Sequence, residues 1–214
     1  MNIACIGARN LNDRALELCS LIGTEIASYK HNLHTGNAPG ADHAFAYGAN
    51  SIRPESVYLH QPWPDFNKST ILPANNVVNV SFGNLRFYTV IASKEHPNWK
   101  NLSQGVKKLM IRNVSIIMPP PTRFPVDLCI AFPGETLGGT GQGMRVATTR
   151  GVKIINLRDI NSVKALLKID DRNTRSTEIN LLIHRIFHND FYGESGCHDL
   201  HPVKMIPWNQ VEPG

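Results

Sequence analysis

Three glycine-containing turns carry the side chains in this sequence that are best suited to binding an anion. They are 7–10 (GARN), 35–42 (TGNAPGAD) and 138–143 (GGTGQG), and each follows a short apolar run. Glycine lets a ligand approach bare backbone, and strand-to-helix turns of an open α/β sheet present free N–H groups to a phosphate. Arg9 adds a cation to the first turn. Together the three turns predict a site for a nucleotide or a phosphosugar.

Each of these turns also has a purely structural explanation. Glycine at such a turn is more often structural than phosphate-binding, so one turn alone indicates little. Asp42 in the second turn can either cap the following helix or accept a hydrogen bond from a ribose hydroxyl. The third turn differs from the usual dinucleotide-binding fingerprint, because it follows a late strand and has no acidic residue at the ribose position. It is the combination of three turns that favours a ligand site.

A polar pair, Arg112 and Asn113, interrupts the helix that Ser103 is expected to cap. Asn113 falls within the apolar stripe of that helix, where an amide without a partner costs roughly 1–3 kcal/mol. One interpretation is structural: Asn113 pairs with a loop carbonyl and Arg112 is solvated. The other is that both side chains face the ligand crevice, where Arg112 binds a phosphate or a carboxylate.

The order of the predicted elements gives the sheet that positions these residues. Short apolar runs typical of buried strands occupy 2–7, 33–35, 57–59, 126–132 and 152–156. Helical patterns alternate with them, the last full one at 144–150. This alternation predicts an α/β fold with a doubly wound, parallel, Rossmann-like sheet over residues 1–158.

Two stretches depart from this alternation. Residues 61–102 predict an insertion with a short hairpin around 77–91, and residues 159–214 predict a loop-rich C-terminal extension with short helices near 163–167 and 178–187. The aromatic residues of the insertion are Trp63, Phe66, Phe82, Phe87, Tyr88 and Trp99. A lid that stacks on one base explains them slightly better than a polynucleotide platform, and a small satellite core explains them as well as the lid does.

The composition excludes several classes of protein. Of the 214 residues 42% are apolar and 18% charged, which argues against a disordered, collagen-like or coiled-coil chain. No apolar run approaches the ~20 residues of a membrane span, and the first residues lack the features of a signal peptide, so we expect a cytoplasmic protein. The net charge is +5, with sixteen Lys and Arg against nine Asp and Glu in residues 1–158. An anionic partner is therefore expected to meet this first part of the chain.

The cysteines and histidines predict no metal site and no other cofactor. The cysteines, which show no C-x-x-C spacing, are Cys5, Cys19, Cys129 and Cys197. We expect buried free thiols in a reducing cytosol. A cluster near the end of the chain comprises His184, His188, Cys197, His198 and His201. Its spacing matches neither an H-E-x-x-H site nor a standard zinc finger, so a structural or exposed role is favoured over metal binding.

The motifs GAR, TGNAPGAD, RN and PGETLGGTGQGMRVA, followed by GVKIINL, resemble those of the SLOG superfamily over about residues 1–158. This Rossmann-like group holds the DNA-processing protein A (DprA) family and the Lonely Guy (LOG) phosphoribohydrolases. The chain is most similar to compact DprA-like proteins that bacteriophages often encode. The resemblance implies a phosphorylated, nucleotide-like ligand at the three turns, and a homo-oligomer, because such proteins commonly build their sites between subunits.

The residue patterns and the resemblance together predict a single set of ligand-binding residues. These are Gly7, Ala8, Arg9, Gly36, Asn37, Gly40, Asp42, Arg112, Asn113, Gly138, Gly139, Thr140, Gly141, Gln142 and Arg145. We expect the arginines among them to surround one crevice that takes a small phosphorylated ligand.

One departure from the resemblance bears on catalysis. LOG enzymes cleave the N-glycosidic bond of a nucleotide with a glutamate and an arginine, and Arg112 resembles that arginine. Arg145 stands where the glutamate is expected, and the nearest acids in sequence, Asp127 and Glu135, lie outside the motif. We therefore expect binding without turnover. In a phage-encoded protein this would sequester a host signalling nucleotide in the host cytoplasm, an anti-defence function.

Two other functions stay open. One is a nucleotide N-ribohydrolase with a displaced catalytic acid, in which Arg112 would be catalytic. The other is a DprA-like recombination mediator that binds single-stranded DNA. Its basic patch would comprise Lys100, Lys107, Lys108, Arg112, Arg145 and Arg150.

Overall fold

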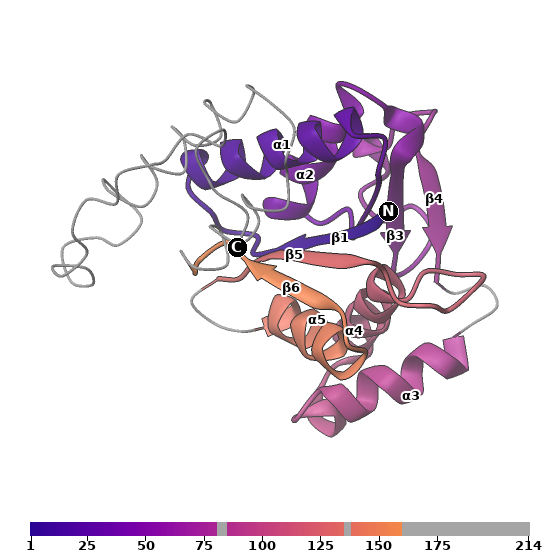
Figure 1. Cartoon of the computed structure of the whole chain (residues 1–214). Coiled ribbons are helices and arrows are strands. Elements are labelled where there is room, and N and C mark those ends of the chain that lie inside the picture. Colours follow the sequence, from indigo (N-terminus) through magenta and orange to yellow (C-terminus); the bar gives the residue numbers. More distant parts are fainter. Residues whose placement is uncertain (81–84, 135–137, 160–214) are drawn as a thin grey trace, which may run out of the picture.

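A six-stranded, all-parallel sheet forms the centre of the protein in a computed structural model that describes residues 1–80, 85–134 and 138–159 (Figure 1). The strands are β1 (Asn2–Gly7), β2 (Asn32–Thr35), β3 (Val57–Gln61), β4 (Asn76–Asn79), β5 (Leu128–Phe132) and β6 (Lys153–Asn156). They lie in the order β4-β3-β2-β1-β5-β6, and each neighbouring pair is parallel. The predicted doubly wound, Rossmann-like sheet is confirmed, and its strand order reverses between β1 and β5.

Helices cover both faces of the sheet (Figure 1). On one face lie α1 (Asp13–Ser28) and α2 (Ala41–Asn50), and on the other α3 (Leu85–Glu95), α4 (Gln104–Ile117) and α5 (Gly138–Thr149). Short 3-10 helices occupy Pro54–Ser56, Lys68–Thr70 and Trp99–Asn101. The expected cap of α4 is present, since Ser103 Oγ accepts from the Val106 N–H (3.4 Å), and Asn12 Oδ1 caps α1 by accepting from the Ala15 N–H (2.9 Å).

Two hydrophobic cores, one on each face of the sheet, follow from the alternation of side chains along β1. Cys5 packs with α1 and α2 in the first core, and its neighbours Ala4 and Ile6 pack with α3, α4 and α5 in the second. Strands covered on both faces read as continuous apolar runs, which is why the sequence identified them. The thiols of Cys5, Cys19 and Cys129 are free and buried, as expected.

The stretch 61–102 contributes one strand and one α-helix to the fold besides two short 3-10 helices, and the hairpin predicted around 77–91 is wrong. β4 pairs in parallel with β3 from Tyr58↔Asn76 to Gln61↔Asn79 and becomes the edge strand of the main sheet. The residues after it form α3, whose buried side chains Tyr88, Ile91 and Ala92 recur at helical spacing. That spacing is the signal that the hairpin prediction overlooked.

The helix expected at 144–150 begins earlier than predicted. α5 starts at Gly138, so the GGTGQG segment forms its first turns and is not a loop. Glycine has a low helix propensity, which hid this start in the sequence. Packing explains the glycine at 143, because a Cβ there would press on Ile6 Cδ1 of β1. Propensity was overridden by the need for close contact between helix and sheet.

The remainder of the C-terminal extension, residues 160–214, lies outside the described residues. The helices predicted near 163–167 and 178–187, Cys197 and the histidine cluster all fall there. Among the described residues, no helix has both the length and the apolar character needed to cross a membrane.

Charge is distributed unequally between the two helical layers. Residues 85–126, which form α3, α4 and their connections, hold seven Lys and Arg against one Glu. Residues 1–61, which supply α1, α2 and three strands, hold four Lys and Arg against five Asp and Glu. The basic surplus expected for the first part of the chain therefore lies mainly on the α3–α4 side of the sheet.

Candidate functional site

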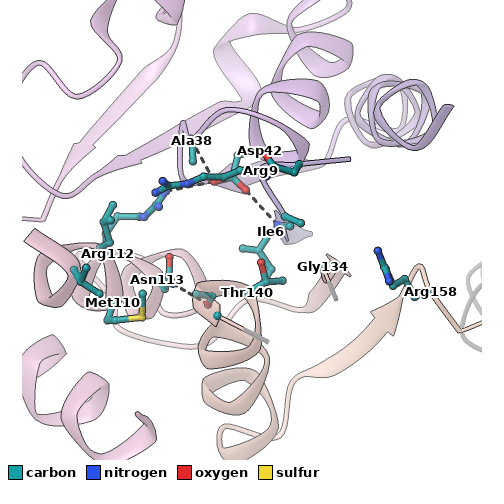
Figure 2. A pocket seen from close by; sticks show the side chains of 17 residues that line it. Ile6, Arg9, Ala38, Asp42, Met110, Arg112, Asn113, Gly134, Thr140 and Arg158 are labelled. Carbon is teal, nitrogen blue, oxygen red and sulfur yellow. Dashed lines mark hydrogen bonds and ion pairs between the residues drawn. The ribbon is translucent and has the colours of Figure 1, made fainter. Parts of the chain in front are cut away.

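A cavity of about 660 Å³ lies at the carboxyl ends of β1 and β5, where the strand order of the sheet reverses (Figure 2). It is lined by Ile6, Gly7, Ala8, Arg9, Asn10, Ala38, Asp42, Val106, Leu109, Met110, Arg112, Asn113, Gly134, Gly138, Gly139, Thr140 and Arg158. Nine of the fifteen predicted ligand-binding residues are in this lining. Open α/β sheets bind ligands at such a reversal, and the volume is within the roughly 300–1,000 Å³ of small-molecule sites.

The first two predicted turns meet at one side of the cavity. The Ala8 carbonyl accepts a hydrogen bond from the Ala41 N–H (3.0 Å), which docks the start of α2 on the first turn. Gly40 makes this contact feasible: its φ is +85°, and a Cβ would collide with the carbonyls of Ala8 and Arg9. Gly40 therefore shapes the turn that presents Arg9 without lining the cavity itself.

Arg112 and Asp42 form a buried ion pair at the cavity. Arg112 Nη1 lies 3.4 Å from Asp42 Oδ2, and the two side chains are 5% and 7% exposed. Asp42 also accepts from the N–H groups of Gly7 (3.3 Å) and Ala38 (3.4 Å). Figure 2 shows Arg112 reaching from α4 toward Asp42, beside which Arg9 lies. The prediction that Arg112 is solvated is wrong, and its alternative, that Arg112 faces the crevice, agrees with the geometry.

Burial dominates the electrostatics of this pair. It raises the pKa of Asp42 above its ordinary value, while the charge of Arg112 and the Ala38 and Gly7 N–H groups act in the opposite direction. Burial also lowers the pKa of Arg112, Asp42 opposes this, and the nearby positive charge of Arg9 adds to the lowering. A guanidinium nevertheless keeps its proton in proteins, so two cations and one carboxylate meet here. Among the described residues, Arg112 Nε has no hydrogen-bond partner.

The N-terminal turn of α5 forms another wall of the cavity. Gly138, Gly139 and Thr140 line it, and Asn113 Nδ2 on α4 donates to the Gly139 carbonyl at 3.0 Å. The structural interpretation predicted a loop carbonyl as the partner of Asn113, whereas the carbonyl it meets belongs to α5, and Asn113 lines the cavity as well. The first N–H groups of a helix lack partners within the helix, so this turn offers donors to an anion.

Five other predicted residues lie outside the lining. Gly36 packs under Arg112, because a Cβ there would overlap Arg112 Nη1. Asn37 is 1% exposed and holds a neighbouring loop. Gly141 and Gln142 are buried within α5, and neither amide atom of Gln142 has a partner among the described residues. Arg145 Nε donates to the Glu95 carbonyl of α3 at 2.7 Å. The expectation that Arg145 shares one crevice with Arg9 and Arg112 is therefore wrong.

The acids named in the sequence analysis do not supply a second carboxylate among the described lining residues. Asp127 accepts from the Asn2 N–H (2.7 Å) at the amino ends of the strands, which is the opposite edge of the sheet. Glu135 lies outside the described residues. Among the described lining residues the acidic one is Asp42. Its carboxylate already pairs with Arg112 and accepts from backbone N–H groups.

The aromatic lid expected from 61–102 is wrong for the described residues, since none of their aromatic side chains lines the cavity. Tyr88 belongs to the second core, and Trp99 packs against that core. Trp63 and Phe66 form an edge-to-face pair with ring centroids 5.1 Å apart. Phe82 lies outside the described residues. Tyr88 and Trp99 therefore agree better with the interpretation of these aromatic residues as part of a core than with the lid.

Sequence reasoning missed an apolar wall and a third arginine. Val106, Leu109 and Met110, which belong to the apolar stripe of α4, line the cavity. The stripe lines the cavity near the start of α4, where Val106 is 36% exposed, and packs in the core along the second half of the helix, which is buried from Met110 to Ile117. Arg158 lies two residues past the end of β6. The rule that ligands bind at the carboxyl ends of strands would have found it.

A second buried polar cluster lies between β2, β3 and α4. His34 Nδ1 is hydrogen-bonded to His60 Nε2 (3.1 Å), and His60 Nδ1 to Ser115 Oγ (2.9 Å). Ser115 Oγ donates to the Arg112 carbonyl at 2.8 Å, and His34 Nε2 lies 3.3 Å from Asn2 Oδ1. Burial lowers the pKa of His34 to about 4. Burial, then His34 and Arg112, hold the pKa of His60 well below its ordinary value, so both rings are neutral at pH 7.

Comparison of the chain with protein-family models, with curated proteins and with solved structures found no match.

Proposed function

We propose that this protein binds a phosphorylated, nucleotide-derived small molecule in the cavity at the carboxyl ends of β1 and β5. The observation that carries the proposal is Arg112. It is a buried cation with one carboxylate at 3.4 Å, and among the described residues its Nε has no hydrogen-bond partner. A buried charge of this kind is costly unless a further partner completes its bonding, and a phosphate oxygen beside Arg9 and Arg112 does so.

The rest of the lining supports a ligand with one charged and one apolar part. The first turn of α5 adds N–H donors, and Arg158 adds a further cation. Val106, Leu109 and Met110 offer an apolar wall on which a planar base packs. The resemblance to the SLOG superfamily supports the same ligand class, and the phage-like form of that resemblance supports sequestration of a host signalling nucleotide.

Binding without turnover is the form of this function that we favour. Arg145 stands where the resemblance expects a catalytic glutamate, and Asp42 is engaged by Arg112 and two backbone N–H groups. The test is incubation with nucleoside monophosphates and NAD-type dinucleotides followed by chromatography. Release of a free base would establish the N-ribohydrolase instead, with Asp42 as its first candidate acid.

A pair of variants at Gly138 tests the binding proposal directly. A Cβ at Gly138 meets no described atom within 4 Å, so a side chain there projects into open space, whereas one at Gly139 would press on Met110 and Asn113. Gly138→Asp places a negative charge in the first turn of α5, and Gly138→Asn has the same size without the charge. We expect isothermal titration with AMP and ADP to show affinity at least tenfold lower for the Asp variant than for the Asn variant, about 1.4 kcal/mol.

Other results of the titration would count against the proposal. Equal affinity of the two Gly138 variants would show that the anionic group of the ligand does not bind at the first turn of α5. Absence of binding by the wild-type protein across a wider nucleotide panel, with no small molecule found by mass spectrometry of the purified protein, would overturn the proposed function.

Single-stranded DNA binding is the second candidate, and the charge of the α3–α4 side favours it. Arg86, Lys94, Lys100 and Lys108 are exposed there, and Lys107 lies 5.8 Å from the ring centre of Trp99. Contacts to many phosphates make affinity fall steeply as salt rises, because counterions are released on binding. Titration of an oligonucleotide at salt concentrations from about 50 to 200 mM tests this. For six phosphate contacts the affinity should fall about 10³-fold over that range. A flat salt response excludes this function.

A further inference from the structure

In the loop that follows β3, the segment 66–70 is fastened to one buried residue, Asn37. Asn37 Nδ2 donates to the carbonyls of Phe66 (3.1 Å) and Asn67 (3.2 Å), and its Oδ1 accepts from Thr70 Oγ1 (2.7 Å). Asn67 Nδ2 in turn donates to the Asn37 carbonyl at 2.7 Å. Asn37 is 1% exposed, so the side chain at the centre of this network is shielded from water. The loop therefore has one well-defined position against the start of α2.

The consequence of this fastening is the position of the Phe66 ring. Its centre lies 5.9 Å from Arg112 Cζ, and Trp63 supports it edge-to-face at 5.1 Å. Neither aromatic residue is among those that line the cavity, whereas Arg112 is. Phe66 thus contacts the guanidinium without taking space from a ligand.

Arg112 is enclosed on several sides as a result. Its Nη1 packs against the bare backbone of Gly36, where a Cβ would overlap it, and pairs with Asp42 at 3.4 Å. The negative face of an aromatic ring stabilises a cation, which here offsets the repulsion from Arg9. An arginine side chain that is already ordered loses less rotamer freedom when it binds an anion.

We propose that Phe66 is a positioning residue: the Asn37-fastened loop holds its ring against the guanidinium of Arg112 and keeps that cation oriented for the anionic group of the ligand. The inference rests on the proposed function of the cavity. It assigns to Phe66, which Trp63 supports, a role behind the cation, in place of stacking on a base.

Substitutions at Phe66 separate this role from simple packing. Phe66→Leu keeps apolar volume and removes the ring, and Phe66→Tyr keeps the ring. Phe87→Leu is the matched control, because the Phe87 ring faces another cation, Arg123 Cζ at 5.0 Å, and does not line the cavity. With AMP and inorganic pyrophosphate as probes, we expect about tenfold weaker binding by Phe66→Leu. Phe66→Tyr and Phe87→Leu should bind within twofold of wild type.

The same experiment has outcomes that overturn the proposal. Wild-type affinity in a folded Phe66→Leu variant would show that the ring does not position Arg112. Equal losses in Phe66→Leu and Phe87→Leu would show that the effect is one of general stability, which thermal unfolding of both variants measures in parallel.

A measurement without ligand keeps the positioning role testable even if Phe66→Leu does not fold or no probe binds. NMR of arginine-labelled protein reports rotation about the Cζ–Nε bond. In the wild-type protein we expect Arg112 to show separate signals for its two Nη groups, and solvent-exposed arginines to show averaged ones. An averaged signal for Arg112 overturns the positioning role. Absence of probe binding together with separate Nη signals overturns the proposed function alone.

Discussion

Two polar clusters are buried beside α4, and they differ in charge and in whether each polar atom has a partner. In the cluster of His34, His60 and Ser115, each ring nitrogen and the hydroxyl lie within 3.3 Å of a polar atom, and burial keeps both rings neutral. The Asp42–Arg112 pair is charged, its contact is longer at 3.4 Å, and Arg112 Nε has no partner among the described residues. Arg112 lines the cavity, and no member of the histidine cluster does.

The difference separates polar groups that serve the fold from those available to a ligand. Neutral groups that hydrogen-bond to one another tie β2 and β3 to α4 without burying a charge. A buried charge with bonding capacity left over is costly for folding, and such a group at a cavity is a reason to look for a ligand. The clusters meet at one point, since Ser115 Oγ donates to the Arg112 carbonyl. The histidine cluster therefore fixes the segment of α4 from which Arg112 projects.

The largest expected effect comes from removing the cation. Arg112→Met leaves the Asp42 carboxylate buried without its charge partner, which should lower the free energy of unfolding at pH 7 by about 4 kcal/mol. Asp42 already has a raised pKa, and losing Arg112 raises it further. A carboxyl with a raised folded-state pKa is penalised as pH rises, so the deficit should shrink toward pH 4. Urea unfolding at pH 7 and pH 4.5 measures both values.

A double variant separates stability from binding in this pair. Arg112→Met with Asp42→Asn carries no buried charge and should recover most of the lost stability. Its affinity for the nucleotide that the wild-type protein binds should stay about a hundredfold lower, near 2.7 kcal/mol. If isothermal titration instead shows that affinity returns together with stability, Arg112 serves the fold as the histidines do, and the contrast between the clusters fails.

The next effect in size is an acid-dependent loss of stability from the histidine cluster. The pKa of His34 is about 4 in the folded protein and near 6.5 when unfolded, so the unfolded chain binds the proton first. This contribution is complete above pH 6.5 and is lost as pH falls toward 4, by on the order of 3 kcal/mol. Urea unfolding of the wild type and of His34→Gln between pH 7.5 and 4 should show a smaller acid loss in the variant.

His96 provides the control for that comparison. It lies near the protein surface between α3 and α4, where burial and then the charge of Arg145 lower its pKa, so His96→Gln should reduce the acid loss by less than His34→Gln does. A His34→Gln variant that loses stability with acid as steeply as the wild type would show that other groups carry the pH dependence. The neutral cluster would then have no measurable electrostatic role.

The sequence was most informative where local pattern and burial agree. Continuous apolar runs identified the central strands, and the polar Asn113 inside an apolar stripe identified the part of α4 that meets the cavity. The pairing of Arg112 with Asp42 joins residues 70 positions apart. No local pattern specifies such a partner, because it depends on which helices the sheet brings together.

Two misinterpretations have a common physical cause. In each, packing against a neighbouring element outweighed what the local sequence indicated. The glycines of 138–143 suggested a loop, and contact between α5 and β1 made them helical. Arg145 suggested a ligand contact because of its position in a motif, and its place on the surface of α5 turned it toward α3. In both cases the neighbouring element, which the sequence alone does not reveal, determined the outcome.

The smallest expected effect concerns Arg145, the predicted ligand residue that the fold places elsewhere. Arg145→Gln removes a 2.7 Å hydrogen bond to the Glu95 carbonyl, which should lower the free energy of unfolding by about 1 kcal/mol. Arg150→Gln, at an exposed position just past the same helix, is the matched control and should change stability by less than about 0.5 kcal/mol. Neither variant should alter nucleotide affinity in the titration that detects Arg112→Met, since neither side chain lines the cavity. A tenfold affinity loss in Arg145→Gln alone would mean that the packing of α5 on α3 controls the first turn of α5, and the ligand site would then extend beyond the residues around Arg112.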